Sequence, residues 1–291
     1  MHIELPTQAG AYRWYYFDVD AGEHTAVCIF MIGSIFSARY SARLARGALP
    51  VEHSSVNFAL YRRGVRQLWV LSEYPTASVE NEGQTLRIGQ SVLRYMPDGR
   101  VEISIRDRSM PWRSVVDAQL SFEPSPATSG PLQLIDGLSH HWHPIAPRGM
   151  GTVTLPTLTM RGRGYHDGNF GEVALGTDCP GWEWSRLHFS DRTEVRYRPY
   201  SRGAGLRLVA RDSTTVTTVR EALEPLETTR TRWGLEVPAK TRLLESSPFY
   251  ARHETETPNG TVLGEVADFA RFHRPSIRWM ASLRTRLGQR A

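Results

Sequence analysis

Short apolar or alternating runs recur along most of the chain, and they predict β-strands rather than long helices. Residues 100–106 alternate strictly, with Val101, Ile103 and Ile105 on one face, which is the pattern of a half-buried strand. Comparable runs follow one another at roughly 8–12 residues, a spacing typical of sandwiches and barrels. The predicted strands are residues 11–19, 25–35, 55–61, 67–71, 85–89, 91–95, 100–106, 118–124, 151–158, 172–175, 182–189, 194–197, 206–209, 214–219 and 233–237.

Two segments break this pattern and predict helix. Residues 37–47 have a basic face and end at Gly47, which is a C-cap signal. Residues 277–287 place apolar side chains at helical spacing and most of their arginines on the other face. The apolar residues of this segment are Trp279, Met280, Leu283 and Leu287. Such a basic segment can lie on a membrane surface, or it can pack on the protein with its arginines in solvent.

A segment rich in Pro, Ser, Gly and Thr, residues 124–138, separates two groups of predicted strands. This composition is typical of a connection between domains. The length of 291 residues suits one large β domain or two smaller ones. We therefore predict an all-β protein with domains at 1–123 and 139–291, the linker 124–138 between them, and a short C-terminal helical segment.

The formal net charge is +5, and the stretch Arg271–Arg290 contains six arginines and no acid. A basic balance suits nucleic acid, an anionic membrane surface or solubility alone. No nucleic-acid module is recognisable, so no nucleic-acid partner is expected. We find neither an apolar run of transmembrane length nor a secretory signal. Because Cys28 and Cys179 are the only cysteines, we expect a cytoplasmic protein without a disulfide framework.

The densest group of aromatic, imidazole and carboxyl side chains lies in residues 139–186. Its centre, 162–171, contains four glycines together with Tyr165, Asp167 and Asn169. Polar groups among glycines indicate a site, although a hairpin turn capped by Asp167 would have the same composition. If the stretch is extended, Tyr165 and Asp167 lie on one face of a strand and point inward together.

An acid enclosed by aromatic rings can protonate an alkene. Burial raises the pKa of a carboxyl group, so that the group holds a proton near neutral pH. Aromatic faces can then stabilise the carbocation that protonation creates. Asp167 is the candidate acid, and Trp142, Trp182 and Trp184 are the candidate walls.

No metal site and no cofactor are expected. His140, His141, His143 and His166 could act as ligands with Asp167. On a strand, however, His140 would face away from His141 and His143. Neither H-E-x-x-H nor paired-cysteine spacing accompanies them. The chain also lacks the G-x-S-x-G, P-loop and dinucleotide-binding motifs.

Several blocks in the right order resemble the carotenoid 1,2-hydratase (hydroxyneurosporene synthase) family, over nearly the whole chain. The most specific blocks are His140–Arg148, Gly164–Gly171 and Trp182–Arg186, and the others are Gly10–Asp18, Phe30–Ser37, Val56–Tyr61, Pro248–Arg252 and Gly264–Phe272. The resemblance implies two lipocalin-like β-barrel or sandwich domains. It also implies cofactor-free addition of water to the terminal C1=C2 bond of an acyclic carotenoid such as neurosporene or lycopene.

The resemblance further implies a set of catalytic residues, which are His140, Trp142, Tyr165 and Asp167. Asp167 would protonate C2, and Trp142 and Tyr165 would stabilise the tertiary cation at C1. His140 or Asp167 would take up the proton of the attacking water. Substrate-binding residues are expected around this set, namely Trp182, Trp184, His166, Asn169 and Phe170.

An apolar polyene is soluble only in a membrane, so the resemblance implies peripheral docking on the inner or photosynthetic membrane. The basic segments 39–46 and 273–291 are candidate contacts. Two alternatives remain open at this stage. One is a cyclase or isomerase of a polyene or polyketide on the same scaffold, whose product would contain no added water. The other is a carotenoid or lipid carrier, which would need no buried acid at Asp167.

Overall fold

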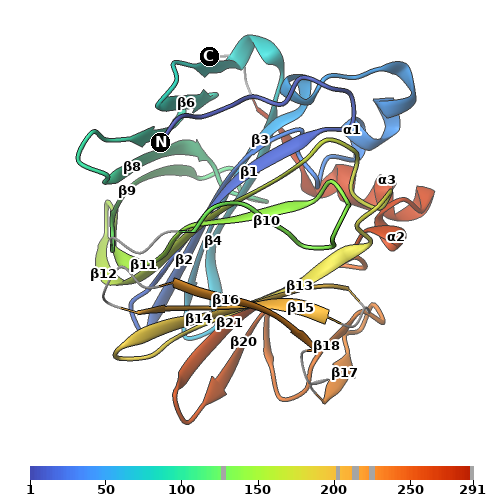
Figure 1. Cartoon of the computed structure of the whole chain (residues 1–291). Helices are drawn as coiled ribbons and strands as arrows, with labels where there is room; N and C mark the ends of the chain where they lie inside the picture. The colour runs from blue at the N-terminus through green and yellow to red at the C-terminus, as the bar shows by residue number, and fades with distance from the viewer. Residues whose placement is uncertain (126–128, 201–203, 212–215, 223–226, 289–291) are drawn as a thin grey trace.

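The computed structural model describes residues 1–125, 129–200, 204–211, 216–222 and 227–288. Most of this length forms two large sheets that lie as layers, one above the other (Figure 1). Their strands pair antiparallel, apart from the parallel pair formed by β22 (Arg286–Leu287) and β4 (Val65–Tyr74). The prediction of an all-β fold is therefore confirmed.

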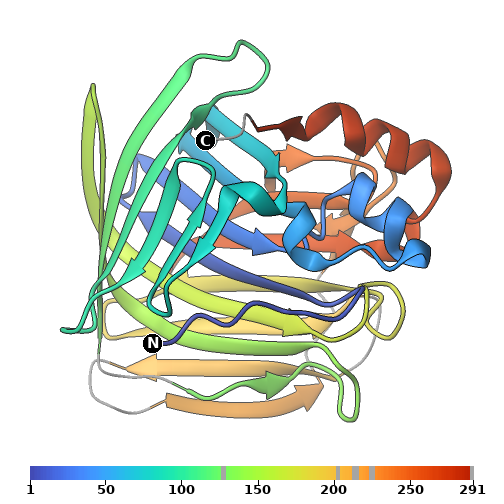
Figure 2. The same cartoon turned by 90° about the horizontal axis from the view of Figure 1, so that it is seen from above.

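The larger sheet has thirteen described strands and curls into a half-barrel (Figure 2). Its order is β22-β4-β3-β2-β1-β12-β11-β9-β8-β7-β6-β5, with β10 paired to β11. Besides β4 and β22, its strands are β1 (Tyr12–Asp20), β2 (His24–Ile32), β3 (Ser54–Arg62), β5 (Val79–Asn81), β6 (Thr85–Ile88), β7 (Ser91–Tyr95), β8 (Val101–Arg108), β9 (Val115–Pro124), β10 (Leu132–Gln133), β11 (His141–Leu155) and β12 (Leu158–Gly171).

The smaller sheet has seven described strands in the order β16-β15-β14-β13-β21-β20-β19 and covers one face of the half-barrel (Figure 1). Its strands are β13 (Gly181–His188), β14 (Arg192–Pro199), β15 (Ala204–Arg211), β16 (Val216–Ala222), β19 (Arg242–Ser246), β20 (Tyr250–Thr257) and β21 (Gly260–Asp268). A separate two-stranded ribbon joins β17 (Thr228–Arg230) to β18 (Glu236–Pro238).

The helices gather at one end of the molecule (Figures 1 and 2). The predicted helix at 37–47 is confirmed as α1 (Ala38–Arg43) and a 3-10 turn that ends at Gly47, whose φ is +74°. The C-terminal helical segment is confirmed as α2 (Phe269–Phe272) and α3 (Pro275–Arg284). None of the described helices is long and apolar enough to cross a membrane. The short 3-10 segments are Leu44–Arg46, Pro50–His53 and Thr76–Ser78.

The alternation of side chains along β1 divides the interior into two cores. Tyr15 and Phe17 point into the concave side of the half-barrel. Trp14 and Tyr16 point the other way, into the layer between the two sheets. This division follows from the period of two along a strand, because both faces of the central strands are covered.

Buried polar contacts tie the two sheets together. Arg186 on β13 donates to Asp18 on β1 at 2.6 Å, and both side chains are fully buried. Arg252 on β20 similarly donates to the hydroxyl of Tyr61 on β3 at 2.9 Å. Such pairs fix how one sheet lies on the other, because a misplaced sheet would leave a charge buried without a partner.

Some local predictions differ from the structure. Residues 162–171 form the end of β12, which excludes the alternative of a turn, but the strand predicted at 172–175 is wrong, since these residues form a bend that leads into a turn. In the predicted strand 233–237 only residues 236–237 are extended, and residues 214–215 of another lie outside the described residues.

The division into two domains at 124–138 remains a prediction. Residues 126–128 of that segment lie outside the described residues. On either side of it, β9 and β11 are paired neighbours, and β11 and β12 belong to the larger sheet with β1. The smaller sheet begins only at Gly181.

Candidate active site

The glycines of β12 permit close packing of an extended strand. A side chain at Gly164 would come within 2.5 Å of the Phe122 ring, and one at Gly171 within 2.5 Å of the Tyr12 hydroxyl. Neither glycine has a positive φ, so conformational freedom is not what requires them. They are needed because bulky aromatic rings lie directly against the strand.

The prediction that Tyr165 and Asp167 point inward from one strand face is confirmed. The Tyr165 hydroxyl donates to Oδ2 of Asp167 at 2.6 Å. Nε1 of Trp142, on the neighbouring strand β11, donates to the same oxygen at 2.8 Å. Nδ2 of Asn169 lies 3.4 Å from Oδ1. The carboxyl group is therefore held by three neutral donors.

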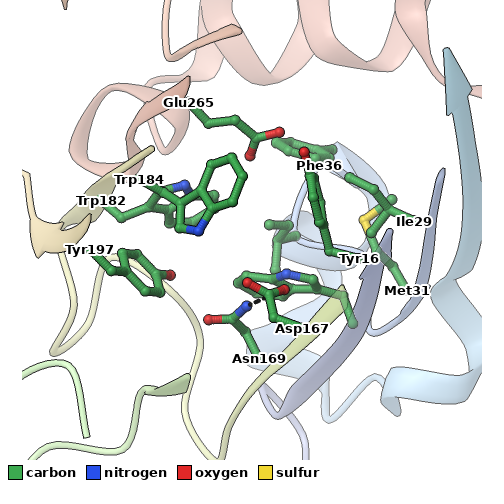
Figure 3. A pocket seen from close by; sticks show the side chains of 12 residues that line it. Tyr16, Ile29, Met31, Phe36, Asp167, Asn169, Trp182, Trp184, Tyr197 and Glu265 are labelled. Carbon is green, nitrogen blue, oxygen red and sulfur yellow. Dashed lines mark hydrogen bonds between the residues drawn. The ribbon is translucent and has the colours of Figure 1, made fainter. Parts of the chain in front are cut away.

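Asp167 faces a small cavity between the two sheets (Figure 3). Aromatic rings make most of its walls, and two carboxyl groups and one amide supply its polar chemistry. The lining residues are Trp14, Tyr16, Ile29, Met31, Ile35, Phe36, Asp167, Asn169, Trp182, Trp184, Tyr197 and Glu265. Trp182 and Trp184, predicted as walls, thus lie beside the candidate acid.

Burial raises the pKa of Asp167 to about 7. The hydrogen bonds from Tyr165 and Trp142 favour the charged form and offset part of this rise, whereas the charges of Glu265 and Asp18 add to it. A carboxyl group with this pKa holds a proton near neutral pH and can donate it to a substrate.

His140 does not line the cavity. Its Nδ1 lies 2.6 Å from the Tyr12 hydroxyl and its Nε2 lies 2.8 Å from the Tyr197 hydroxyl. Burial lowers the pKa of the imidazole to about 3, so the ring is neutral. His140 contacts the cavity-lining residues Trp14, Trp182 and Tyr197 from behind, and both of its nitrogens are already engaged.

Trp142 and Tyr165 also lie behind Asp167 rather than on the cavity wall. Their polar atoms are directed at its carboxyl group. The rings that face the open space are instead those of Tyr16, Trp182 and Trp184 (Figure 3).

His166 and Phe170, which were expected to bind substrate, point to the other face of β12. His166 stacks on Phe17 with ring centroids 3.8 Å apart and bonds the Tyr95 hydroxyl at 2.8 Å, inside the half-barrel. Phe170 stacks on His141. The structure therefore does not bring these two residues together with Asp167, because alternation along a strand separates odd from even positions.

Eight of the lining residues are absent from the predicted site, among them Trp14, Tyr16, Tyr197 and Glu265. An aromatic run at 12–17 marks the first two only as strand residues. Glu265 lies in the family block Gly264–Phe272, but its local sequence does not mark it as a site residue. It enters the cavity because β21 pairs with β13, which places it opposite Trp184.

The histidines that are close in sequence are dispersed in space. His140 packs on Tyr12 and Trp14, His166 packs on Phe17, and His141 packs on Phe170. Within the described ranges, no three His, Cys, Asp or Glu side chains are arranged to hold a metal ion.

Known proteins resemble this chain in sequence over most of its length. A family model for carotenoid hydratases of the CrtC type matches residues 28–291. The acyclic carotenoid 1,2-hydratase of Thiocapsa roseopersicina is 31% identical over 305 residues, covering 97% of this chain and 74% of that protein. The enzyme of the same name from Cereibacter sphaeroides is 29% identical, covering 88% of this chain and 96% of its own length.

Among solved structures, a Nitrosomonas europaea protein assigned as AttH superposes with a TM-score of 0.52. It is 12% identical and covers 88% of this chain and 92% of its own. That likeness concerns the fold alone. The names of these sequence relatives, together with the acid that aromatic rings enclose in this chain, define an enzyme of the hydro-lyase class. The chain belongs to the carotenoid hydratase (CrtC) family, as its sequence blocks indicated.

Proposed function

We propose that the enzyme adds water to the terminal C1=C2 bond of an acyclic carotenoid, without a cofactor and through a tertiary carbocation. The observation that carries this proposal is the placement of Asp167, whose pKa is raised to about 7, on a wall of an aromatic cavity. The names of the two relatives, both acyclic carotenoid 1,2-hydratases, support the substrate class.

The reaction follows from these groups. Asp167 gives its proton to C2, and the π electrons of C1=C2 form the new C–H bond. The positive charge develops at C1, where two methyl groups and the faces of Tyr16 and Trp184 stabilise it. A water lone pair then forms the C1–O bond, and the water loses a proton. General acid catalysis of this kind contributes typically about 10²–10⁴-fold.

The four predicted catalytic residues divide into two kinds in this proposal. Asp167 touches the substrate. Trp142 and Tyr165 orient its carboxyl group through their hydrogen bonds, and His140 orients Tyr197. The last three are therefore positioning residues, and the rings that line the cavity take over the role of stabilising the cation.

The rest of a long polyene needs space beyond this cavity. Phe36 lines both the Asp167 cavity and a second, neighbouring cavity. The second cavity shares Phe249, Ala281 and Arg284 with a third hollow, which α3 borders with Ile277 and Met280. These shared residues support a path from Asp167 past Phe36 to the underside of α3, and we propose that the polyene lies along it.

The outer side of α3 suits a membrane surface. Trp279 and Leu283 are 68% and 60% exposed, and Leu287 beyond the helix is 60% exposed. Arginines flank these side chains, including Arg274 and Arg278; Arg290 lies outside the described residues. Apolar residues with basic neighbours bind anionic interfaces. We propose that this face docks on the membrane, so that a polyene passes from the bilayer into the path beneath α3.

The test is product mass. The protein is incubated with neurosporene or lycopene in anionic liposomes, and we expect a product heavier by one water. Asp167→Asn should lower hydration at least 10²-fold, while Asp98→Asn on an exposed turn should not. A product of unchanged mass would favour cyclisation or isomerisation, and binding without product would favour a carrier. Full activity of Asp167→Asn would contradict the proposed acid.

A further inference from the structure

A second carboxyl group, that of Glu265, faces the cavity from the side opposite Asp167 (Figure 3). Glu265 is buried and lies on β21 of the smaller sheet, whereas Asp167 lies on β12 of the larger one. Its Oε1 accepts a hydrogen bond from Nε of Arg252 at 3.0 Å. Within the described part of the chain, Oε2 has no hydrogen-bond partner.

The two carboxyl groups have opposite surroundings. Glu265 pairs with the guanidinium of Arg252, which is itself buried and anchored by Glu245 and the Tyr61 hydroxyl. Among the described contacts, Asp167 has only the neutral donors Tyr165, Trp142 and Asn169. Burial favours the protonated form of Asp167, whereas Glu265 lies beside a cation. Paired carboxyl groups in such unequal surroundings divide the roles of base and acid.

The cavity between them also has polar atoms that are suited to hold water. The Tyr16 hydroxyl, Nε1 of Trp184 and Oδ1 of Asn169 are buried and have no hydrogen-bond partner within the described residues. The Tyr16 hydroxyl lies near Asp18 and the Trp184 N–H lies near Tyr165, but neither pair has hydrogen-bond geometry. A buried water needs two to four polar partners, and these atoms supply them together with Oε2 of Glu265.

We propose that Glu265 is the catalytic base that holds the attacking water and removes its proton; this inference rests on the hydratase function proposed above. The water lone pair forms the C1–O bond while one O–H bond breaks and its proton moves to Glu265. Asp167 is then a carboxylate and Glu265 a carboxylic acid. Transfer of the proton back to Asp167 through solvent water restores the starting state. His140 cannot take this role, since both of its nitrogens are bonded to tyrosine hydroxyls.

The experiment separates protonation from water capture by using D₂O. In the wild-type protein we expect lycopene or neurosporene to give a hydrated product with deuterium at C2. Glu265→Gln keeps a hydrogen-bond acceptor for Arg252 but removes the base, and hydration should fall about 10²-fold or more. Asp167 still protonates the alkene, so the cation should return a proton to it. Deuterium should therefore accumulate in unhydrated carotenoid.

The matched control is Glu254→Gln. Glu254, on β20, is buried like Glu265, but it bonds Thr25 and does not line the cavity. The Glu254→Gln protein should therefore give the same ratio of deuterated unhydrated carotenoid to hydrated product as the wild type. Retained hydration in Glu265→Gln would overturn the proposal. Loss of both hydration and deuterium uptake, in a Glu265→Gln protein that melts like the wild type, would also overturn it. If the wild-type protein produces neither signal, the hydratase function itself fails.

Discussion

Tyr165 and Asp167, two residues apart on β12, are joined by a 2.6 Å hydrogen bond from the tyrosine hydroxyl to Oδ2. Trp142 donates to the same oxygen at 2.8 Å. The two donors fix the orientation of the carboxyl group, and they also oppose the effect of burial on its pKa. Substitution of either donor should therefore change the pKa of Asp167 while its carboxyl group stays in place.

Activity should follow the protonation of Asp167. Because its pKa is about 7, we expect kcat/KM to fall tenfold per unit above that pH. Tyr165→Phe removes a donor that stabilises the charged form, so the alkaline fall should move to higher pH. Tyr16→Phe changes a cavity residue that does not bond Asp167, and the position of the fall should stay the same. Equal profiles for wild type and Tyr165→Phe would contradict this coupling.

Stability should depend on pH through the same group. The carboxyl of Asp167 has an ordinary pKa of 3.8 but keeps its proton to about pH 7 in the folded protein. Its contribution to stability is therefore fully present at low pH and is lost as the pH rises from about 4 to about 7. Relative to Asp167→Asn, the wild type should lose up to roughly 4 kcal/mol of unfolding free energy over this range.

Urea unfolding of the wild type and of Asp167→Asn at pH 4, 5.5, 7 and 8.5 measures this difference. The comparison cancels the other titrating groups that the two proteins share. A difference that does not change with pH would show that Asp167 has the same pKa in the folded and the unfolded protein.

The buried pair of Arg186 and Asp18 should be a strong link between the two sheets. Arg186→Met leaves Asp18 charged and buried without its partner, which should cost about 3–5 kcal/mol of unfolding free energy. The exposed pair of Arg100 and Asp98 provides the control, because solvent screens it and Arg100→Met should cost far less. Denaturant midpoints measure both, and similar costs for the two substitutions would argue against an interior link.

Membrane binding should depend on the exposed apolar side chains of α3. The double substitution Trp279→Ser and Leu283→Ser should weaken binding to anionic liposomes at least tenfold, since each side chain contributes roughly 1.5–3 kcal/mol when fully buried. Binding of the wild type should also weaken as salt rises. Val219→Ser alters an exposed apolar residue on β16, at the opposite edge of the smaller sheet from β19, and should have no effect. Sedimentation with liposomes measures all three proteins.

Much of the site could be predicted from the sequence because its signals are local. The alternation of apolar residues marked most strands, and the period of two put Tyr165 and Asp167 on one face of β12. The concentration of Trp182 and Trp184 near Asp167 in sequence also carried over to space. Sequence blocks of this length further identified the family, which the comparisons confirmed.

What the sequence alone determined is therefore which residues lie in strands and which side chains share a strand face, because steric alternation acts over neighbouring residues. Only the tertiary structure decided which face of β12 meets the second sheet, and so why Asp167 lines the cavity while His166 and Phe170 do not. It also decided that Glu265 lies across from Asp167 and that Arg186 meets Asp18, 168 residues away. Contacts between sheets depend on the packing of whole layers, and no local pattern of residues encodes them.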